Sequence, residues 1–200
     1  MRVRKSARDR KTEITRAALA LAFELGPERV TTGLIADRLG LTQPAIYKHF
    51  STKEDIWRAA TDILCDAIAD NIAGAATEPR PDARLRKLVS GQLRLLQNYP
   101  ALPEIMVMRD PDGAQTALRS QVLNSMAGFR QAMAGAIGEA CADGTYRTDI
   151  EPGDCATLIF GVVQGLVLRL LRFRDTGDLV KDGERLLDLQ LSLIAGPGER

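Results

Sequence analysis

The sequence predicts an all-helical protein, with a small N-terminal domain over residues 1–52 and a larger helical domain over residues 53–200. Aromatic residues make up only 4% of the 200 residues, although 45% are hydrophobic. Small and aliphatic side chains therefore build the core, which favours helices over sheets rich in β-branched and aromatic residues. Apolar residues also recur with the helical period along most of the chain.

The N-terminal part of the chain is basic, although the whole chain carries a net charge of only +1. Residues 1–60 hold 12 Lys and Arg against 7 Asp and Glu, and the remaining 140 hold 15 against 19. A basic arm before a folded domain is typical of nucleic-acid binding, and a solvated, disordered tail is the alternative. The basic residues of the arm are Arg2, Arg4, Lys5, Arg8, Arg10 and Lys11.

The first helix is predicted from about Thr12 to Gly26, where a Gly-Pro pair ends it. Its apolar residues fall at i, i+3, i+4, i+7, i+8 and i+11, which is one stripe of a helix. They are Ile14, Ala17, Ala18, Leu21, Ala22 and Leu25.

A second helix is predicted after Thr31, which is a good N-cap, and it ends at Gly40, where a residue with positive φ is expected. Leu34, Ile35 and Leu39 are expected to face the first helix. Thr42 is expected to cap a third helix directly after this turn. Residues 31–50 thus predict a helix, a tight turn containing glycine and another helix.

The stretch LTQPAIYKHF, residues 41–50, explains what this third helix does. Pro44 falls in the first helical turn, where its missing N–H costs nothing. Ile46 and Phe50 are four residues apart and point into the core, so one side remains for polar residues. This arrangement predicts a helix-turn-helix, whose second helix lies in the DNA major groove.

The exposed side of this helix carries groups suited to DNA. Gln43 can pair with a base edge, and Pro44 and Ala45 can contact a thymine methyl group. Hydroxyl, amine and imidazole groups can donate to phosphates, as can helix N-termini. The predicted DNA-binding residues are Thr31, Thr32, Thr42, Gln43, Pro44, Ala45, Tyr47, Lys48, His49 and Lys53.

Residues 30–60, VTTGLIADRLGLTQPAIYKHFSTKEDIWRAA, resemble the DNA-binding region of the TetR family of bacterial transcriptional regulators. The resemblance rests on the elements TT, IA, LGL, YxHF and KE. It implies three DNA-binding helices, a fourth connecting helix, a larger regulatory domain, and a homodimer on a palindromic operator of double-stranded DNA. Gly33 departs from the family, many of whose members have a longer polar or basic residue there. The positions that match the family's DNA contacts are Thr31, Gln43, Pro44, Ala45, Tyr47, His49 and Lys53.

The rest of the chain also has helical spacing. A connecting helix is predicted to begin after Ser51 or Thr52 and to end near Gly74. Loop signals containing Pro, Gly and Asp separate the remaining segments. Further helices are expected near residues 83–98, 101–109, 115–143, 153–174 and 180–194.

The helix near residues 153–174 is apolar over most of its circumference, so it must be covered on more than one side. Gly161 and Gly165 would let another helix approach closely. With the last helix it is predicted to form a four-helix interface with a two-fold mate, and the alternative is that both helices are monomer core. The predicted interface residues are Leu158, Val162, Gly165, Leu166, Leu187 and Leu191.

A small-molecule pocket is predicted within the larger domain, because methionines and apolar residues there suit an adaptable cavity. An apolar or aromatic effector is expected, which would shift the dimer to a conformation with mis-spaced DNA-reading helices and release the repressor. The alternative is that these side chains only fill core. The predicted lining residues are Trp57, Leu64, Leu93, Leu96, Met106, Met108, Met126, Phe129 and Met133.

Other protein classes are less consistent with the sequence. It has no GxSxG, P-loop, dinucleotide fingerprint or HExxH motif and only one histidine, so no enzyme activity, metal or cofactor is predicted. Cys65, Cys141 and Cys155 are far apart, which predicts free thiols in the cytoplasm. No membrane partner is expected, because the longest uncharged apolar run is shorter than the roughly 20 residues of a membrane span. A helical protein-interaction module without sequence-specific DNA binding is the main alternative.

Overall fold

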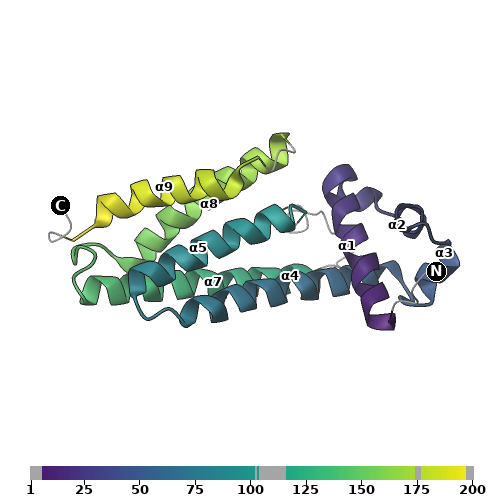
Figure 1. The fold of residues 1–200 in the computed structure, drawn as a ribbon, viewed down its shortest axis with the longest axis horizontal. Coiled ribbons are helices and arrows are strands. Elements are labelled where there is room, and N and C mark those ends of the chain that lie inside the picture. Colours follow the sequence, from purple (N-terminus) through teal and green to yellow (C-terminus); the bar gives the residue numbers. More distant parts are fainter. Residues whose placement is uncertain (1–5, 102, 104–115, 174–176, 197–200) are drawn as a thin grey trace. The chain divides into compact units, whose positions relative to one another are not determined.

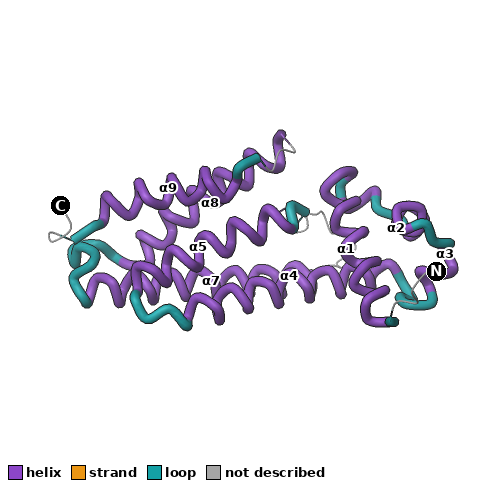
Figure 2. Tube along the Cα trace, in the orientation of Figure 1, coloured by secondary structure: helices purple, strands orange, loops and turns teal. Residues whose placement is uncertain are grey.

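The computed structural model describes residues 6–101, 103, 116–173 and 177–196. The described residues are almost entirely helices and the loops between them (Figures 1 and 2). The all-helical class is therefore confirmed. The helices are α1 (Ala7–Leu25), α2 (Thr32–Leu39), α3 (Gln43–Tyr47), α4 (Lys53–Ala76), α5 (Pro81–Asn98), α7 (Thr116–Ala142), α8 (Pro152–Phe173) and α9 (Leu179–Ile194), with a 3-10 helix η1 (Pro27–Arg29).

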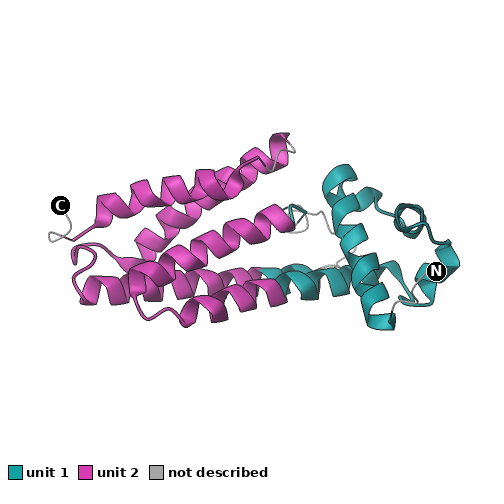
Figure 3. Ribbon diagram, in the orientation of Figure 1, with its two compact units in different colours: residues 1–65, 99–122 teal, residues 66–98, 123–200 magenta. Residues whose placement is uncertain are grey.

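The chain divides into two compact units, coloured separately in Figure 3. Unit 1 comprises residues 1–65 and 99–122, and unit 2 comprises residues 66–98 and 123–200. Helices α4 and α7 each contribute residues to both units. The helix predicted near residues 101–109 lies outside the described residues, apart from residues 101 and 103.

Helix α1 begins earlier than predicted because Ser6 and Asp9 form a capping box. The backbone N–H of Asp9 donates to the Ser6 hydroxyl at 3.1 Å, and the Ser6 N–H donates to the Asp9 carboxylate at 3.3 Å. The helix ends at Gly26, whose φ of 87° suits only glycine well. Leu25, the last residue of the predicted apolar stripe, is 40% exposed at the end of α1.

The turn between α2 and α3 is built as the sequence predicts. The Thr31 hydroxyl accepts a hydrogen bond from the Leu34 N–H at 3.2 Å and so caps α2. Gly40 has a left-handed φ of 61°, and its N–H and that of Leu41 bond back to carbonyls of α2 at 3.2 and 2.9 Å. This Schellman arrangement satisfies the last carbonyls of α2 and sets the direction in which the chain enters α3.

The buried side of α2 differs from the predicted one. Thr32, Ile35 and Ala36 are buried at i, i+3 and i+4, which defines a single helical stripe. Leu34 falls outside that stripe and is 37% exposed, so the expectation that it faces α1 is wrong. Leu39 is half-buried.

Helix α4 begins with a reciprocal cap formed by Thr52 and Asp55. The Asp55 N–H donates to the Thr52 hydroxyl and the Thr52 N–H donates to the Asp55 carboxylate, both at 3.1 Å. Thr52 rather than Ser51 is therefore the capping residue. Hydrogen bonding to Thr52 lowers the pKa of the Asp55 carboxyl, with the larger effect from the Thr52 side chain and a smaller one from its backbone N–H.

Unit 2 depends on two close helix contacts at glycines. A Cβ at Gly91 of α5 would lie 1.8 Å from the side-chain oxygen of Asn71 in α4, whose amide donates to the Leu88 carbonyl at 3.0 Å. A Cβ at Gly183 of α9 would lie 2.3 Å from a methyl carbon of Leu93 in α5. Both glycines are needed for this spacing of the helices.

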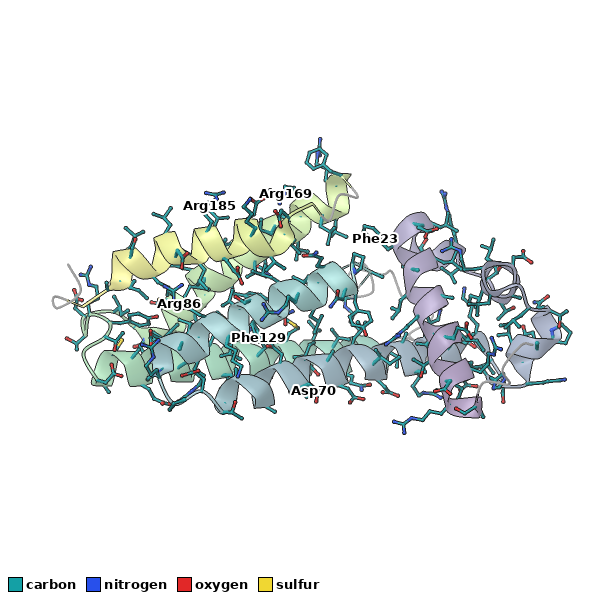
Figure 4. All side chains as sticks on the ribbon, viewed as in Figure 1. Phe23, Asp70, Arg86, Phe129, Arg169 and Arg185 are labelled. Carbon is teal, nitrogen blue, oxygen red and sulfur yellow. The ribbon has the colours of Figure 1, made fainter. Side chains whose placement is uncertain are left out.

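The interior of unit 2 is filled by aliphatic and sulfur-containing side chains around Phe129 of α7, which is fully buried (Figure 4). Cys155 is buried and Cys141 is half-buried, and both are free thiols. Burial raises the pKa of both thiols, which keeps them protonated and less reactive.

Helix α8 is the one described helix that is long and apolar enough to cross a membrane by length and composition alone, with a mean hydropathy of 1.7 in its most apolar window. Cys155, Ile159, Val163, Leu166 and Leu170 form its buried side. A core helix of a globular protein has the same composition. The opposite side of α8 stays exposed in the single chain.

Candidate nucleic-acid interface

Helix α3 presents one apolar and one polar side. Ile46 is fully buried and Phe50 is 5% exposed, so these two residues anchor the segment in unit 1 as predicted. Gln43, Pro44 and Lys48 are exposed on the other side. Tyr47 is 48% exposed, which is high for a large aromatic side chain.

A single hydroxyl group of α2 holds two of these exposed side chains. The Gln43 amide nitrogen donates to the Thr32 hydroxyl oxygen at 2.8 Å, and the hydroxyl groups of Thr32 and Tyr47 lie 3.3 Å apart. The three side chains therefore form a network that orients Gln43 and Tyr47 before any partner is bound. The Gln43 carbonyl oxygen and its second N–H are not used in this network, so they can still pair with a base edge.

The prediction that Thr32 contacts DNA directly needs correction. Its side chain is only 5% exposed, and its hydroxyl is engaged with Gln43 and Tyr47. Thr32 is thus a positioning residue beneath the interface. The sequence signal for this role is the threonine at the first position of a helix whose other inward residues are apolar.

The other two threonines are exposed at helix N-termini. The Thr31 hydroxyl accepts from the Leu34 N–H, and its own proton remains available to an acceptor. Thr42 occupies the N-cap position of α3 without a side-chain capping bond, so its hydroxyl is not used within the helix. Both positions suit an anion such as a phosphate, because the first backbone N–H groups of a helix point out of its N-terminal end and can donate to it.

Basic side chains surround α3. Lys48 is exposed, while His49 and Lys53 are half-buried. The Lys11 ammonium of α1 lies 5.4 Å from the centre of the Phe50 ring, a cation–π contact that connects α1 with the segment after α3. Of the basic arm, Arg8 is exposed and Arg10 pairs with Glu13 at 2.6 Å; Arg2, Arg4 and Lys5 lie outside the described residues.

An ion pair connects α1 and α2 at the side of this unit. The Arg38 guanidinium donates to both carboxylate oxygens of Glu24, at 2.9 and 2.5 Å. These hydrogen bonds lower the pKa of the Glu24 carboxyl. The pair is exposed, so it adds little to folding stability, and its main effect is to connect α1 with α2.

Gly33 lies in the first turn of α2, beside the exposed Thr31. A Cβ built on Gly33 would meet only the Thr31 hydroxyl oxygen, at 3.7 Å, which is ordinary contact. The backbone at Gly33 can therefore carry a side chain, and the glycine leaves this part of the surface without one.

The residues predicted to line an effector pocket are buried wherever the structure describes them. Of the described ones, Trp57 and Leu64 belong to unit 1 and the remaining five belong to unit 2. Burial fits a core as well as a cavity, so the pocket stays a prediction. Met106 and Met108 lie outside the described residues. The buried residues of unit 2 in this set are Leu93, Leu96, Met126, Phe129 and Met133.

A polar hollow of about 780 Å³ lies elsewhere in unit 2, between α5, the end of α9 and the loop after α7. Its arginines are already paired, Arg86 with Asp188 and Arg147 with Asp149. None of the predicted pocket residues lines it.

The residues predicted for a dimer interface separate into two groups. Leu158 is 70% exposed, Gly165 is exposed and Val162 is half-exposed. Leu166, Leu187 and Leu191 are at most 5% exposed because α8 and α9 pack within the same chain, so these three belong to the core of the protomer. Leu189 and Leu193 of the last helix, which was predicted to form this interface, are exposed as well, and so is Leu168 of α8, which the prediction omitted.

A helix-turn-helix with an exposed polar helix defines a DNA-binding protein class, and comparison with known proteins identifies the family. A family model described as bacterial regulatory proteins, tetR family, matches residues 14–60. A model described as tetracyclin repressor-like, C-terminal domain, matches residues 81–181, half of the chain. The chain therefore belongs to the TetR family of bacterial regulatory proteins, and it is a DNA-binding transcriptional regulator, as predicted.

Individual relatives agree with this assignment. The HTH-type transcriptional regulator TtgR of Pseudomonas putida is 28% identical over 204 residues, which cover 96% of this chain and 95% of TtgR. The TetR-family regulator PfmR from Thermus thermophilus has a TM-score of 0.72 at 19% identity, covering 90% of this chain and 97% of PfmR. A SmeT–triclosan complex has a TM-score of 0.69 at 22% identity, covering 94% and 92% of the two chains. At these identities the two solved structures establish the shared fold.

Proposed function

We propose that this regulator is a cytoplasmic repressor, which binds a palindromic operator as a homodimer and is released by a small apolar or aromatic molecule. The observation that carries the proposal is the orientation of Gln43 and Tyr47 by the buried Thr32 hydroxyl. Exposed side chains are usually free to move, whereas Gln43 and Tyr47 are held by a buried hydroxyl, which is expected for a surface that binds a specific partner. Pre-organised side chains lose less freedom on binding, which favours specific recognition.

The exposed and half-buried groups of the α3 region each have a role in this proposal. Gln43 pairs with a base edge, and Pro44 and Ala45 contact a thymine methyl group. Hydroxyl and basic groups position the helix by binding phosphates. The phosphate contacts come from Thr31, Thr42, Tyr47, Lys48, His49 and Lys53.

The exposed face of α8 and α9 supports the homodimer. Leu158 and Leu168 of α8 are 70% and 66% exposed, and Leu189 and Leu193 of α9 are 57% and 69% exposed. Between the two α8 leucines, a Cβ added at Gly161 or Gly165 would meet no atom within 4 Å. An exposed apolar face whose glycines allow a second helix to approach closely can pack against the same face of a second copy. The two copies then form an isologous four-helix interface.

Release by a ligand follows from a shift between two dimer conformations. A molecule that binds more tightly to the conformation with mis-spaced α3 helices lowers operator affinity by the ratio of its two affinities. SmeT, whose fold is similar, has been solved with triclosan. If the proposal is correct, ligand weakens DNA binding and DNA weakens ligand binding by the same factor; unequal factors at equilibrium would contradict it.

The DNA-binding proposal is tested by selecting bound sequences from random duplex DNA at near-physiological salt. Wild-type protein should enrich an inverted repeat, and the Tyr47→Ala, Lys48→Ala double variant should not. A matched control is Arg80→Ala, since Arg80 is exposed directly before α5 of unit 2 and lies outside the proposed DNA-binding and dimer surfaces. If folded wild-type dimer enriches no sequence, a protein-interaction role becomes the better interpretation.

The dimer is tested separately by sedimentation of Leu168→Glu and of Leu123→Glu. Both leucines are exposed, but Leu123 lies on α7 and outside the proposed interface. Leu168→Glu should produce folded monomer, because it would place a charge in an apolar contact. If the Leu168→Glu protein remains as dimeric as the Leu123→Glu protein, the α8–α9 face is not the interface.

A further inference from the structure

Helix α5 carries a buried amide in the middle of its apolar side. Gln92 is only 2% exposed. Leu85, Val89 and Leu96 precede and follow it at spacings of seven, three and four residues, and all three are buried. Gln92 therefore occupies a position at which the helical pattern calls for an aliphatic residue.

The hydrogen bonds of this amide are incomplete. Its nitrogen donates to the Met126 sulfur on α7 at 3.7 Å, and a thioether is a weak acceptor. Its carbonyl oxygen has no hydrogen-bond partner among the residues that the structure describes. Exchanging the oxygen and nitrogen of the amide would leave an N–H group unpaired instead, so either orientation leaves a buried polar group unsatisfied.

The surroundings define which chemistry could satisfy Gln92. No Asp, Glu, Lys or Arg is buried in the described part of the chain, and the other buried side chains with an O–H group described in unit 2 are Ser90 and Tyr146. A charged ligand would find no counter-charge in this interior. Met126 is buried but unbranched and flexible, and Phe129 follows it on the same face of α7.

We infer that Gln92 is the polar anchor of the effector site, where its carbonyl accepts a hydrogen bond from the hydroxyl or N–H group of an uncharged, largely apolar molecule. Met126 gives way when the ligand enters, and the ligand body packs against the apolar side chains of α5 and α7. This inference rests on the proposed function, because it identifies the chemical class of the effector. It also explains why an amide occupies a position where leucine would pack without an unpaired polar atom.

The test uses two probe pairs that differ in a single donor: 1-naphthol with 1-methoxynaphthalene, and 1-decanol with its methyl ether. Binding to the full-length protein is measured by calorimetry for wild type, Gln92→Leu and the control Gln97→Leu, which changes an exposed glutamine of the same helix. At least one donor-bearing probe should bind wild type and Gln97→Leu about tenfold more tightly than its ether. Gln92→Leu should remove that preference and should not lower the melting temperature.

Three results would overturn the inference. One is an equal affinity of alcohol and ether for wild type, and another is a preference that survives in Gln92→Leu. The third is that no probe binds wild type, and a lower melting temperature of Gln92→Leu would then identify the amide as a structural group. Release from the operator is measured separately. If a probe binds in a way that depends on Gln92 but leaves operator affinity unchanged, ligand-induced release is contradicted and the Gln92 binding site is still supported.

Discussion

Replacing Thr32 with valine tests whether one hydroxyl organises the DNA-binding surface. Valine keeps the shape of threonine, so the buried packing is preserved while the bonds to Gln43 and Tyr47 are lost. Folding stability should fall by about 1 kcal/mol, the net value of a typical hydrogen bond, because the two exposed partners can bond to water instead.

The effect on DNA affinity should be larger than the effect on stability. Ordering a free side chain at an interface costs about 0.5–1.5 kcal/mol. At the lower end of this range, Gln43 and Tyr47 together cost about 1 kcal/mol in each half-site and about 2 kcal/mol in a dimer, which weakens operator binding roughly 30-fold. The salt dependence should not change, because no phosphate-binding charge is removed.

Fluorescence anisotropy with a labelled operator, at several salt concentrations, measures both quantities. Thr15→Val is the matched control, since Thr15 is a buried threonine of α1 whose hydroxyl donates to the Lys11 carbonyl at 2.9 Å. The control should bind DNA within about twofold of wild type. Wild-type affinity in Thr32→Val, or a changed salt slope, would refute the reasoning.

Further variants test other parts of the structure. Gly33→Arg, compared with Gly33→Ala, should steepen the salt dependence of DNA binding by about 0.9 for each new phosphate contact, as measured by anisotropy. In thermal or urea unfolding, Gly183→Ala should destabilise by about 1–2 kcal/mol, because its Cβ would overlap a buried side chain of α5, whereas Gly128→Ala on an open surface should stabilise by about 0.5–1 kcal/mol. The folded-state pKa of Asp55 is lowered, chiefly by its hydrogen bond with Thr52, so its contribution is present above about pH 4 and is lost as the pH falls. Asp55→Asn should therefore be less stable than wild type at pH 7 in urea unfolding, and the difference should vanish near pH 2; a constant difference would contradict this.

The DNA-binding unit could be predicted well because its signals are local. The N-cap at Thr31, the left-handed Gly40 and the apolar pair Ile46 and Phe50 each follow from a few neighbouring residues. Helix α1 begins before its predicted start, because its first turns are polar and show no apolar periodicity. Only the capping box of Ser6 and Asp9 indicates the true beginning.

The larger domain shows that apolar periodicity identifies a helix face but not whether that face packs within its own chain or against another. Leu158 and Leu166 lie on one apolar helix, yet the first is exposed and the second is buried against its own chain. Both have the same hydropathy, so the sequence alone does not separate core from interface. Polar positions show the same limit, because the sequence predicts a surface contact for Thr32, which is buried. Gln92 is visible in the sequence only as a polar residue that interrupts an apolar stripe.

The shared hydroxyl beneath α3 also has a consequence for how operator preference can evolve. Gln43 and Tyr47 bond to the same atom of Thr32, so a substitution at either position changes the environment of the other. Their effects on DNA preference should therefore be non-additive in a double-mutant cycle. Under the proposed base contacts, a change of operator preference should therefore involve compensating replacements among these three side chains.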